Sequence, residues 1–218
     1  MTNGKKQLIV VGGGGFAREV IWLARDCPQE WEVIGCLDDA EGSQGRTMSD
    51  VPVLGYVDQW HKFSDASFVV AVGSPRSRRK IVQKMSSTGS PKFGTLVHPS
   101  VHKSFYIELG EGSVITAGCV VTTQIRLGRH NIVNINSTLG HDCVFGDYCT
   151  VAPIVAVSGN VTLEDGVEVG TGASLRQGIR LGKGSMVGMG AVVTKDVEEN
   201  GLVVGNPAKL MKILDPFL

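Results

Sequence analysis

From Val97 onward the sequence repeats with a period of six residues, and this repeat constrains the fold more than any other feature. Stepping by six from Val97 to Val193 gives seventeen positions, of which sixteen are apolar and only Lys103 is not. The residue four positions after each apolar anchor is nearly always small or β-branched, and seven of the seventeen hexads carry glycine directly after the anchor. The phase never slips, so every hexad must adopt nearly the same structure.

Such a six-residue unit is typical of a parallel β-helix. Each hexad supplies one short strand and a corner, and three hexads close a triangular coil, so seventeen hexads form between five and six coils. We expect the anchors to fill the interior and the glycines to allow the positive φ that a corner can require. An antiparallel sandwich is the alternative, but it would show period-two alternation with turns every ~8 to 12 residues.

The residues before Val97 lack this period and contain all three tryptophans, which places a boundary near residues 90–97. Strands predicted at residues 7–11, 32–37 and 68–72 alternate with a helix over residues 16–25 and a second helix opened by Ser74 and Pro75. This alternation predicts a small parallel sheet, equivalent to half of a Rossmann fold. We therefore divide the chain into an α/β domain over residues 1–94, a β-helix over residues 95–199 and a C-terminal extension over residues 200–218.

A glycine-rich loop joins the first predicted strand to the first predicted helix. Residues 12–17 satisfy the pattern G-x-G-x-x-A, and Asp38 lies about 24 residues past Gly14. Backbone amides at such a helix start attract phosphate. A redox dinucleotide fold needs two halves and fewer than a hundred residues supply one, so a mononucleotide or nucleotide-sugar pyrophosphate fits better than NAD. In the alternative interpretation, the glycines serve only a tight turn.

His141 is the strongest candidate for proton transfer. It stands two positions after the inward Leu139, so its side chain should point out of the wall, and Asp142 follows it. A neighbouring carboxylate fixes the tautomer of an imidazole and raises its basicity, as a general base requires. The other histidines lack this arrangement: His61 falls in a predicted surface helix, His98 and His102 at the entry to the repeats, and His130 in a variable hexad position.

Composition excludes several other functions. Lysine and arginine total 21, as do aspartate and glutamate, so no net field attracts nucleic acid or an anionic membrane, and the apolar runs are too short to span a bilayer. Five cysteines without a CxxC favour reduced thiols in a cytoplasm. We expect no metal site and no thiol nucleophile, because three cysteines occupy inward small-residue positions. These are Cys119, Cys143 and Cys149.

A basic run lies in the second predicted helix, and in a neutral protein we interpret it as a solvated helix face. It comprises Arg76, Arg78, Arg79, Lys80 and Lys84.

Five segments together resemble a known family. They are Val-Gly-Gly-Gly-Gly-Phe-Ala-Arg-Glu-Val at 11–20, Leu-Asp-Asp at 37–39, Ala-Val-Gly at 71–73, Gly-His-Asp at 140–142 and Val-Val-Gly-Asn-Pro-Ala-Lys at 203–209. The chain is similar over nearly its whole length to sugar acyltransferases in which a small nucleotide-sugar-binding domain precedes a left-handed hexapeptide β-helix. This family includes bacterial acetyltransferases of UDP- or GDP-linked 4-amino-sugars and sialic acid O-acetyltransferase-like proteins.

The resemblance implies a homotrimer with acetyl-CoA in grooves between adjacent β-helices, and His141 as general base tuned by Asp142, where several relatives carry Glu. It implies that the acceptor's nucleotide rests on Gly14, Gly15 and Phe16, near Gly73, with Asp38 and Asp39 reading the base or ribose. Many amino-sugar enzymes carry histidine where this chain has Phe16. Coenzyme A would run past Thr150, Thr171 and Met189 towards Gly205, Pro207 and Lys209 in the C-terminal extension.

We therefore expect an acetyl-CoA-dependent N-acetyltransferase that acts on a nucleotide-linked amino-sugar in bacterial surface glycan synthesis, by direct transfer without an acyl-enzyme. O-acetylation of a sugar hydroxyl on the same fold is an alternative. A β-helical binding protein without turnover, or an NAD-binding domain fused to a structural trimerisation unit, are further alternatives.

Overall fold

The N-terminal part of the chain alternates strands and helices, as predicted. The computed structural model describes residues 4–218. In chain order this part contains β1 (Lys6–Val11), α1 (Gly15–Arg25), β2 (Trp31–Leu37), β3 (Thr47–Met48), β4 (Val51–Gly55), the 3-10 helix η1 (Val57–Phe63), β5 (Ser67–Val70), α2 (Pro75–Ser86) and β6 (Lys92–Phe93).

These strands form one sheet in the order β3-β4-β2-β1-β5-β6. Strand β1 pairs in parallel with β2 on one side and with β5 on the other, so the chain changes direction across the sheet at β1. The carboxyl ends of these three strands therefore meet at one edge, which is where open parallel sheets bind ligands.

Both helices begin where local chemistry favours them. Helix α1 buries the five apolar residues of its predicted inner face: Ala17, Val20, Ile21, Leu23 and Ala24. Ser74 caps α2, since its hydroxyl accepts a hydrogen bond from the backbone N of Ser77 at 3.5 Å, and Pro75 occupies the first helical position. The capping expectation for Ser74 and Pro75 is thus confirmed.

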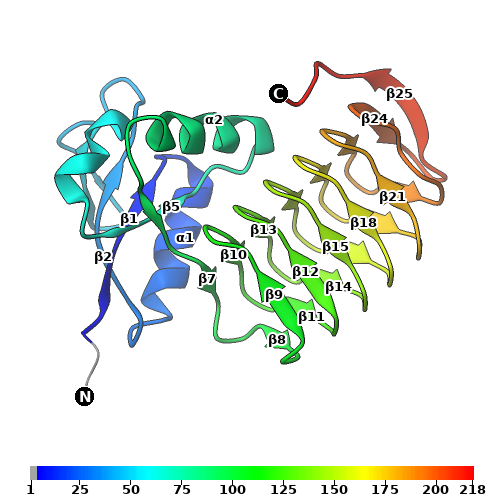
Figure 1. Cartoon of the computed structure of the whole chain (residues 1–218), viewed down its shortest axis with the longest axis horizontal. Coiled ribbons are helices and arrows are strands. Elements are labelled where there is room, and N and C mark those ends of the chain that lie inside the picture. The colour runs from blue at the N-terminus through cyan, green and yellow to red at the C-terminus, as the bar shows by residue number, and fades with distance from the viewer. Residues whose placement is uncertain (1–3) are drawn as a thin grey trace.

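Residues 96–193 form a left-handed parallel β-helix, and Figure 1 shows its stacked coils. Within residues 96–193 each paired residue lies 18 positions from its partner, for example Val114 with Ile132, so three hexads close each coil. The strands are β7 (Leu96–Val97), β8 (His102–Lys103), β9 (Ile107–Leu109), β10 (Val114–Ile115), β11 (Val120–Val121), β12 (Ile125–Leu127), β13 (Ile132–Val133), β14 (Thr138–Leu139), β15 (Val144–Phe145), β16 (Thr150–Val151), β17 (Ala156–Val157), β18 (Thr162–Leu163), β19 (Glu168–Val169), β20 (Ser174–Leu175), β21 (Arg180–Leu181), β22 (Met186–Val187) and β23 (Val192–Val193).

Every third strand belongs to the same face of the prism. We call the faces the β7 sheet (β7, β10, β13, β16, β19, β22, then β24 and β25), the β8 sheet (β8, β11, β14, β17, β20, β23) and the β9 sheet (β9, β12, β15, β18, β21). The corner between the β8 and β9 sheets contains His141, the corner between the β7 and β8 sheets contains Thr171, and the corner between the β9 and β7 sheets faces α2. We call these the His141, Thr171 and α2 corners.

The apolar anchors fill the interior, as the repeat predicts. From Ile115 onward each anchor is buried and belongs to one continuous core, whereas Lys103 is exposed in the open first coil. Lys103, the one anchor that is not apolar, therefore lies in the first coil, which no preceding coil covers.

The glycines that follow the anchors have a different purpose from the predicted one. Positive φ occurs three residues after the anchor, as at Gly112 (φ 71°) and Asp142 (φ 60°), and not at the glycines directly after it. The expectation that these glycines supply positive φ is wrong. A Cβ on Gly140 would lie 2.5 Å from the backbone N of Gly159 on the next coil, so Gly140 is required because successive coils approach closely.

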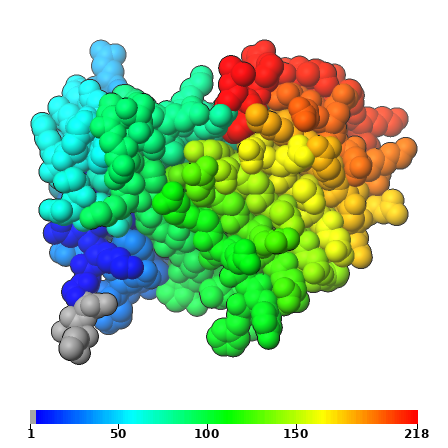
Figure 2. Space-filling view, viewed as in Figure 1, coloured from blue at the N-terminus to red at the C-terminus, as the bar shows by residue number. Residues whose placement is uncertain are grey.

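The C-terminal residues close the far end of the β-helix and return along its side (Figures 1 and 2). Strand β24 (Gly201–Val204) extends the β7 sheet, and β25 (Lys209–Ile213) pairs with it antiparallel. The remaining residues reach α2, where Arg76 Nη1 donates to Pro216 O at 2.8 Å. Phe217 is buried there, 5.0 Å from the Arg79 guanidinium.

The two parts of the chain share a packed interface. Outward-facing residues of the β7 sheet, Leu96, Val114 and Ile132, belong to the same buried cluster as the inner face of α1. At the α2 corner, the interface is polar and depends on Arg78.

Arg78 is fully buried, and the interpretation of the basic run as a solvated face is wrong at this residue. Its guanidinium makes six hydrogen bonds and faces no carboxylate among its partners, which are the carbonyls of Val72, Gly73, His130, Tyr148 and Cys149 and the hydroxyl of Thr150. Burial lowers the pKa of Arg78 to about 10, which still leaves the side chain charged at neutral pH. A helical run of basic residues cannot reveal that one of them bridges two domains.

Across residues 4–218, none of the helices has the length and apolar character needed to cross a membrane.

Candidate active site

His141 lies outside the β-helix wall, as predicted, and is paired with Asp142. Its side chain is 52% exposed, and its Nδ1 lies 2.7 Å from Asp142 Oδ2. With Nδ1 donating to the carboxylate, Nε2 carries the lone pair and is the atom that can accept a proton. The free lone pair of Nε2 and the carboxylate behind the ring form an arrangement suited to general base catalysis.

The neighbouring coils hold the backbone of this pair in place. Asp142 N donates to Thr123 O on the preceding coil at 3.0 Å, and His141 O accepts from Asn160 N on the following coil at 2.7 Å. The left-handed conformation of Asp142 belongs to this corner position in most coils. The side-chain pair is thus mounted on a rigid turn, which suits a site that needs fixed geometry.

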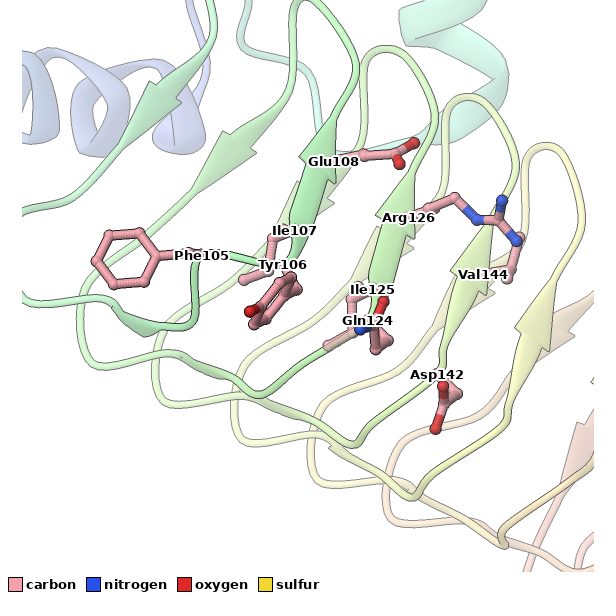
Figure 3. A pocket seen from close by; sticks show the side chains of 9 residues that line it. All are labelled: Phe105, Tyr106, Ile107, Glu108, Gln124, Ile125, Arg126, Asp142 and Val144. Atoms are coloured by element: carbon pink, nitrogen blue, oxygen red, sulfur yellow. The ribbon is translucent and has the colours of Figure 1, made fainter.

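A hollow of about 500 Å³ opens beside Asp142 on the β9 sheet. Figure 3 shows it between the exposed Phe105–Tyr106 turn and the outward residues of three successive strands, with Asp142 at the corner. Glu108 and Arg126 supply opposite charges to its wall. The hollow has no signal in the sequence, because Phe105 and Tyr106 lie within the repeat without altering its phase.

The glycine loop lies at the carboxyl edge of the N-terminal sheet. Gly12 is left-handed (φ 119°), Gly14 is the N-cap of α1 with no side-chain hydrogen bond to it, and a Cβ on Gly14 would meet nothing within 4 Å. The first amides of α1, including those of Gly15 and Phe16, therefore begin a helix that no side chain caps. Such a helix start suits a phosphate.

Asp38 adjoins this loop, with its carboxylate against the backbone of Gly13, where a side chain would collide with it. Both residues line a hollow of about 370 Å³. Gly73 follows the neighbouring strand β5, but its carbonyl is engaged by Arg78 and Thr150. The loop, Asp38 and Gly73 therefore share one edge of the sheet.

Asp39 is already occupied by other partners. Its carboxylate accepts from the backbone N of Val57 at 2.8 Å and from Lys84 Nζ at 2.7 Å. Partial burial would raise the pKa of Asp39, but the hydrogen bonds from Lys84 and Val57 and the Lys84 charge outweigh it, so the pKa is lowered. This carboxylate anchors η1 and α2 to the sheet.

The residues expected to line the coenzyme path fall into three places. Thr171 and Met189 stack 18 residues apart at the Thr171 corner, where Met189 is 80% exposed. Gly205, Pro207 and Lys209 are exposed in the β24–β25 hairpin. Thr150 lies elsewhere: it is buried, donates to Gly73 O at 2.7 Å and accepts from Arg78, so it is an interdomain contact.

The three inward cysteines are core residues, as expected. Cys119, Cys143 and Cys149 are fully buried in the β-helix core, and all five cysteines of the chain are unpaired. Burial raises the pKa of the Cys149 thiol to about 12, so this sulfur stays protonated and unreactive at neutral pH.

Within one chain, the structure does not bring the two halves of the expected site together. The N-terminal domain packs on the β7 sheet, whereas His141 stands at the corner opposite that sheet.

The left-handed hexapeptide β-helix is the fold of the hexapeptide-repeat class of acyltransferases, and the relatives that follow place the chain in this class. The PglD N-terminal domain family matches residues 7–85. The acetyltransferase domain of PglB from Neisseria gonorrhoeae FA1090, solved with acetyl coenzyme A, is 32% identical, with a TM-score of 0.86 over 95% of this chain and 100% of that one. The chain belongs to the hexapeptide-repeat sugar acyltransferase family.

Two other relatives are named for one amino-sugar. A histidine-to-asparagine variant of perosamine N-acetyltransferase from Caulobacter crescentus, solved with CoA and GDP-perosamine, is 29% identical, with a TM-score of 0.86 over 94% of this chain and 97% of that one. GDP-perosamine N-acetyltransferase from Escherichia coli O157:H7 is 29% identical over 161 residues, which are 72% of each chain.

Proposed function

We propose that this enzyme transfers the acetyl group of acetyl-CoA to the amino group of a nucleotide-linked amino-sugar, with His141 as general base. The observation that carries the proposal is the 2.7 Å contact between His141 Nδ1 and Asp142 on an outward corner of the β-helix. The similarity to perosamine N-acetyltransferase, which covers 94% of this chain, supports the substrate class.

The mechanism follows from this pair. The neutral amine of the sugar attacks the thioester carbonyl carbon and forms the C–N bond, while His141 Nε2 accepts a proton from the nitrogen. The C–S bond then breaks, and the leaving coenzyme A thiolate takes up the proton that His141 received, which returns the imidazole to its neutral form. Asp142 holds the ring and stabilises the imidazolium that forms during the reaction, so no covalent acyl-enzyme is needed.

The acceptor's nucleotide would rest at the carboxyl edge of the N-terminal sheet. The uncapped start of α1 offers backbone amides to the pyrophosphate, and the hollow beside Asp38 has space for the rest of the nucleotide. Asp39 is already bound to Lys84 and Val57, so we assign base or ribose recognition to Asp38 in preference to Asp39.

The site would be completed by a second copy of the chain in a homotrimer. His141 faces away from the N-terminal domain of its own chain, and exposed apolar side chains such as Ile154, Met189 and Met211 cover outer surfaces of the β-helix and its terminal hairpin. Coenzyme A would lie between two β-helices, along the Thr171 corner and the exposed hairpin of Gly205, Pro207 and Lys209.

Mass spectrometry after incubation with acetyl-CoA and a panel of GDP- and UDP-linked amino-sugars tests the proposed reaction. N-acetylation adds one acetyl group that survives mild base, whereas an ester on a sugar hydroxyl is lost under the same treatment. An acetylated product that loses the group in base would replace N- with O-acetyl transfer. The absence of any acetylated product from amino-sugars with both nucleotides would overturn the proposal.

A further inference from the structure

The ring of His141 rests on a glycine of the next coil. Gly159 lies 18 residues after His141 and occupies the same corner position, and it is buried although the residues on either side of it are exposed. An added Cβ on Gly159 would lie 2.5 Å from His141 Nε2, 2.6 Å from Cε1 and 2.9 Å from Cδ2. All three nearest atoms belong to the imidazole, so the ring covers the space that a side chain would occupy.

The backbone of Gly159 does not itself require glycine. Its φ lies outside the left-handed region, so alanine can adopt the same conformation. Gly140, on the coil before, differs, because a Cβ there would strike the backbone of Ser158 and Gly159. The absence of a side chain at Gly159 thus makes room for the His141 imidazole, which can rotate away. The absence of a side chain at Gly140 makes room for the backbone of the next coil, which cannot move.

We propose that Gly159 is a positioning residue for His141, an inference that rests on the proposed role of His141 as the base. The imidazole is held at Nδ1 by the Asp142 carboxylate and lies with its Nε2 edge over the bare backbone of Gly159. A methyl group at Gly159 would displace the imidazole from its position over the Gly159 backbone and away from Asp142. It would also occupy space beside Nε2, from which the acceptor amine delivers its proton.

The test is Gly159→Ala, measured for kcat, for KM of the nucleotide-sugar and for thermal stability. Because the ring is half exposed and free to swing away, we expect the melting temperature to stay within about 3 °C of wild type, since surface changes cost little. We expect kcat to fall about 10- to 100-fold, since a displacement of about 1 Å costs up to 10²-fold. The KM for the nucleotide-sugar should change less than twofold. Gln177→Ala, at the same corner one coil further, is the matched control and should leave kcat unchanged.

A second measurement separates positioning from general disruption. In a His141→Ala background the added methyl group meets no ring, so Gly159→Ala should change the residual rate less than twofold. The NMR signals of the His141 ring should shift in Gly159→Ala while those of His61 stay in place. Unchanged His141 signals, or a Gly159→Ala enzyme within twofold of wild-type kcat, would overturn the proposal. If His141→Ala itself keeps wild-type activity, the proposed base fails, and the ring signals still report on Gly159.

Discussion

Replacement of Arg78 by methionine should destabilise the whole molecule, because this buried side chain connects the two domains. Three carbonyl oxygens, those of Val72, His130 and Tyr148, have Arg78 as their only hydrogen-bond donor within residues 4–218. The other acceptors keep alternatives: Gly73 O also accepts from Thr150, and Cys149 O also accepts from a backbone amide. Methionine fills a similar volume but donates no hydrogen bond.

The magnitude follows from those three oxygens. Each buried acceptor without a partner costs about 1 to 3 kcal/mol. Removal of the guanidinium also relieves the cost of burying its charge, so we take the lower value for each of the three oxygens, which gives a total loss of about 3 kcal/mol. For a chain of this size, each kcal/mol lowers the melting temperature by roughly 2 to 4 °C, so we expect a decrease of about 6 to 12 °C.

Differential scanning fluorimetry of wild type, Arg78→Met and the exposed control Lys80→Met would measure this change. Lys80→Met should stay within about 2 °C of wild type, as surface substitutions usually do. Arg78→Lys should recover only part of the loss, because an ammonium group carries three N–H donors where the guanidinium has five. A melting temperature of Arg78→Met within about 2 °C of wild type would refute the assignment of Arg78 as the interdomain connection.

Three further predictions test the site and its surroundings. His141→Ala should lower kcat by about 10² to 10⁴-fold, and a rate within a few-fold of wild type would remove His141 from the mechanism. Gly14→Asp places a negative charge at the helix start that we propose faces the phosphate, and it also caps the helix, so it should abolish acceptor binding without unfolding the protein. Mixed trimers of Gly14→Asp and His141→Ala chains should regain activity if one protomer holds the acceptor and its neighbour supplies the base. No recovery of activity would place both functions in one chain. Burial, with added repulsion from Arg78 and Arg129, lowers the pKa of His130 to about 4, below its usual value near 6.5. As the pH decreases, the unfolded chain therefore binds a proton at this residue before the folded chain does. The free energy of unfolding, measured by urea denaturation, should fall as the pH decreases from about 6.5 to 4. His130→Asn suits the left-handed φ of 55° at this position and should flatten that dependence, whereas an unchanged slope would assign it to other groups.

The β-helix could be predicted from the sequence because its structure is local and repetitive. Each anchor meets the anchor 18 residues away, so a period of six specifies both the interior and the strand register. His141 could be predicted for the same reason, since its distance from Leu139 determines that it points outward. The strand and helix pattern of the first domain follows equally from local apolar spacing and from the Ser74–Pro75 cap.

Contacts between the domains could not be predicted, because they join residues far apart in the sequence with no common period. Arg78 reads as one more basic residue in a helix, yet it is buried against Tyr148 and Thr150 about 70 positions away. Thr150 reads as an ordinary hexad residue for the same reason. Gly159 was one glycine among 29 in the chain, and only the position of the His141 ring gives it a specific role.

The return of the C-terminal residues to α2 limits the number of coils that the β-helix can have. Phe217 packs over Gly166 and Gly184, and Arg76 reaches across from α2 to the carbonyl of Pro216. The insertion of 18 residues would add a coil and preserve every strand pairing, but it would move the terminal hairpin about 4.8 Å farther from α2. The repeat alone would tolerate any number of coils. The contacts of Phe217 and Pro216 fit only the present number of coils, so a variant of this chain with one coil more would lose them unless its C-terminal residues were also redesigned.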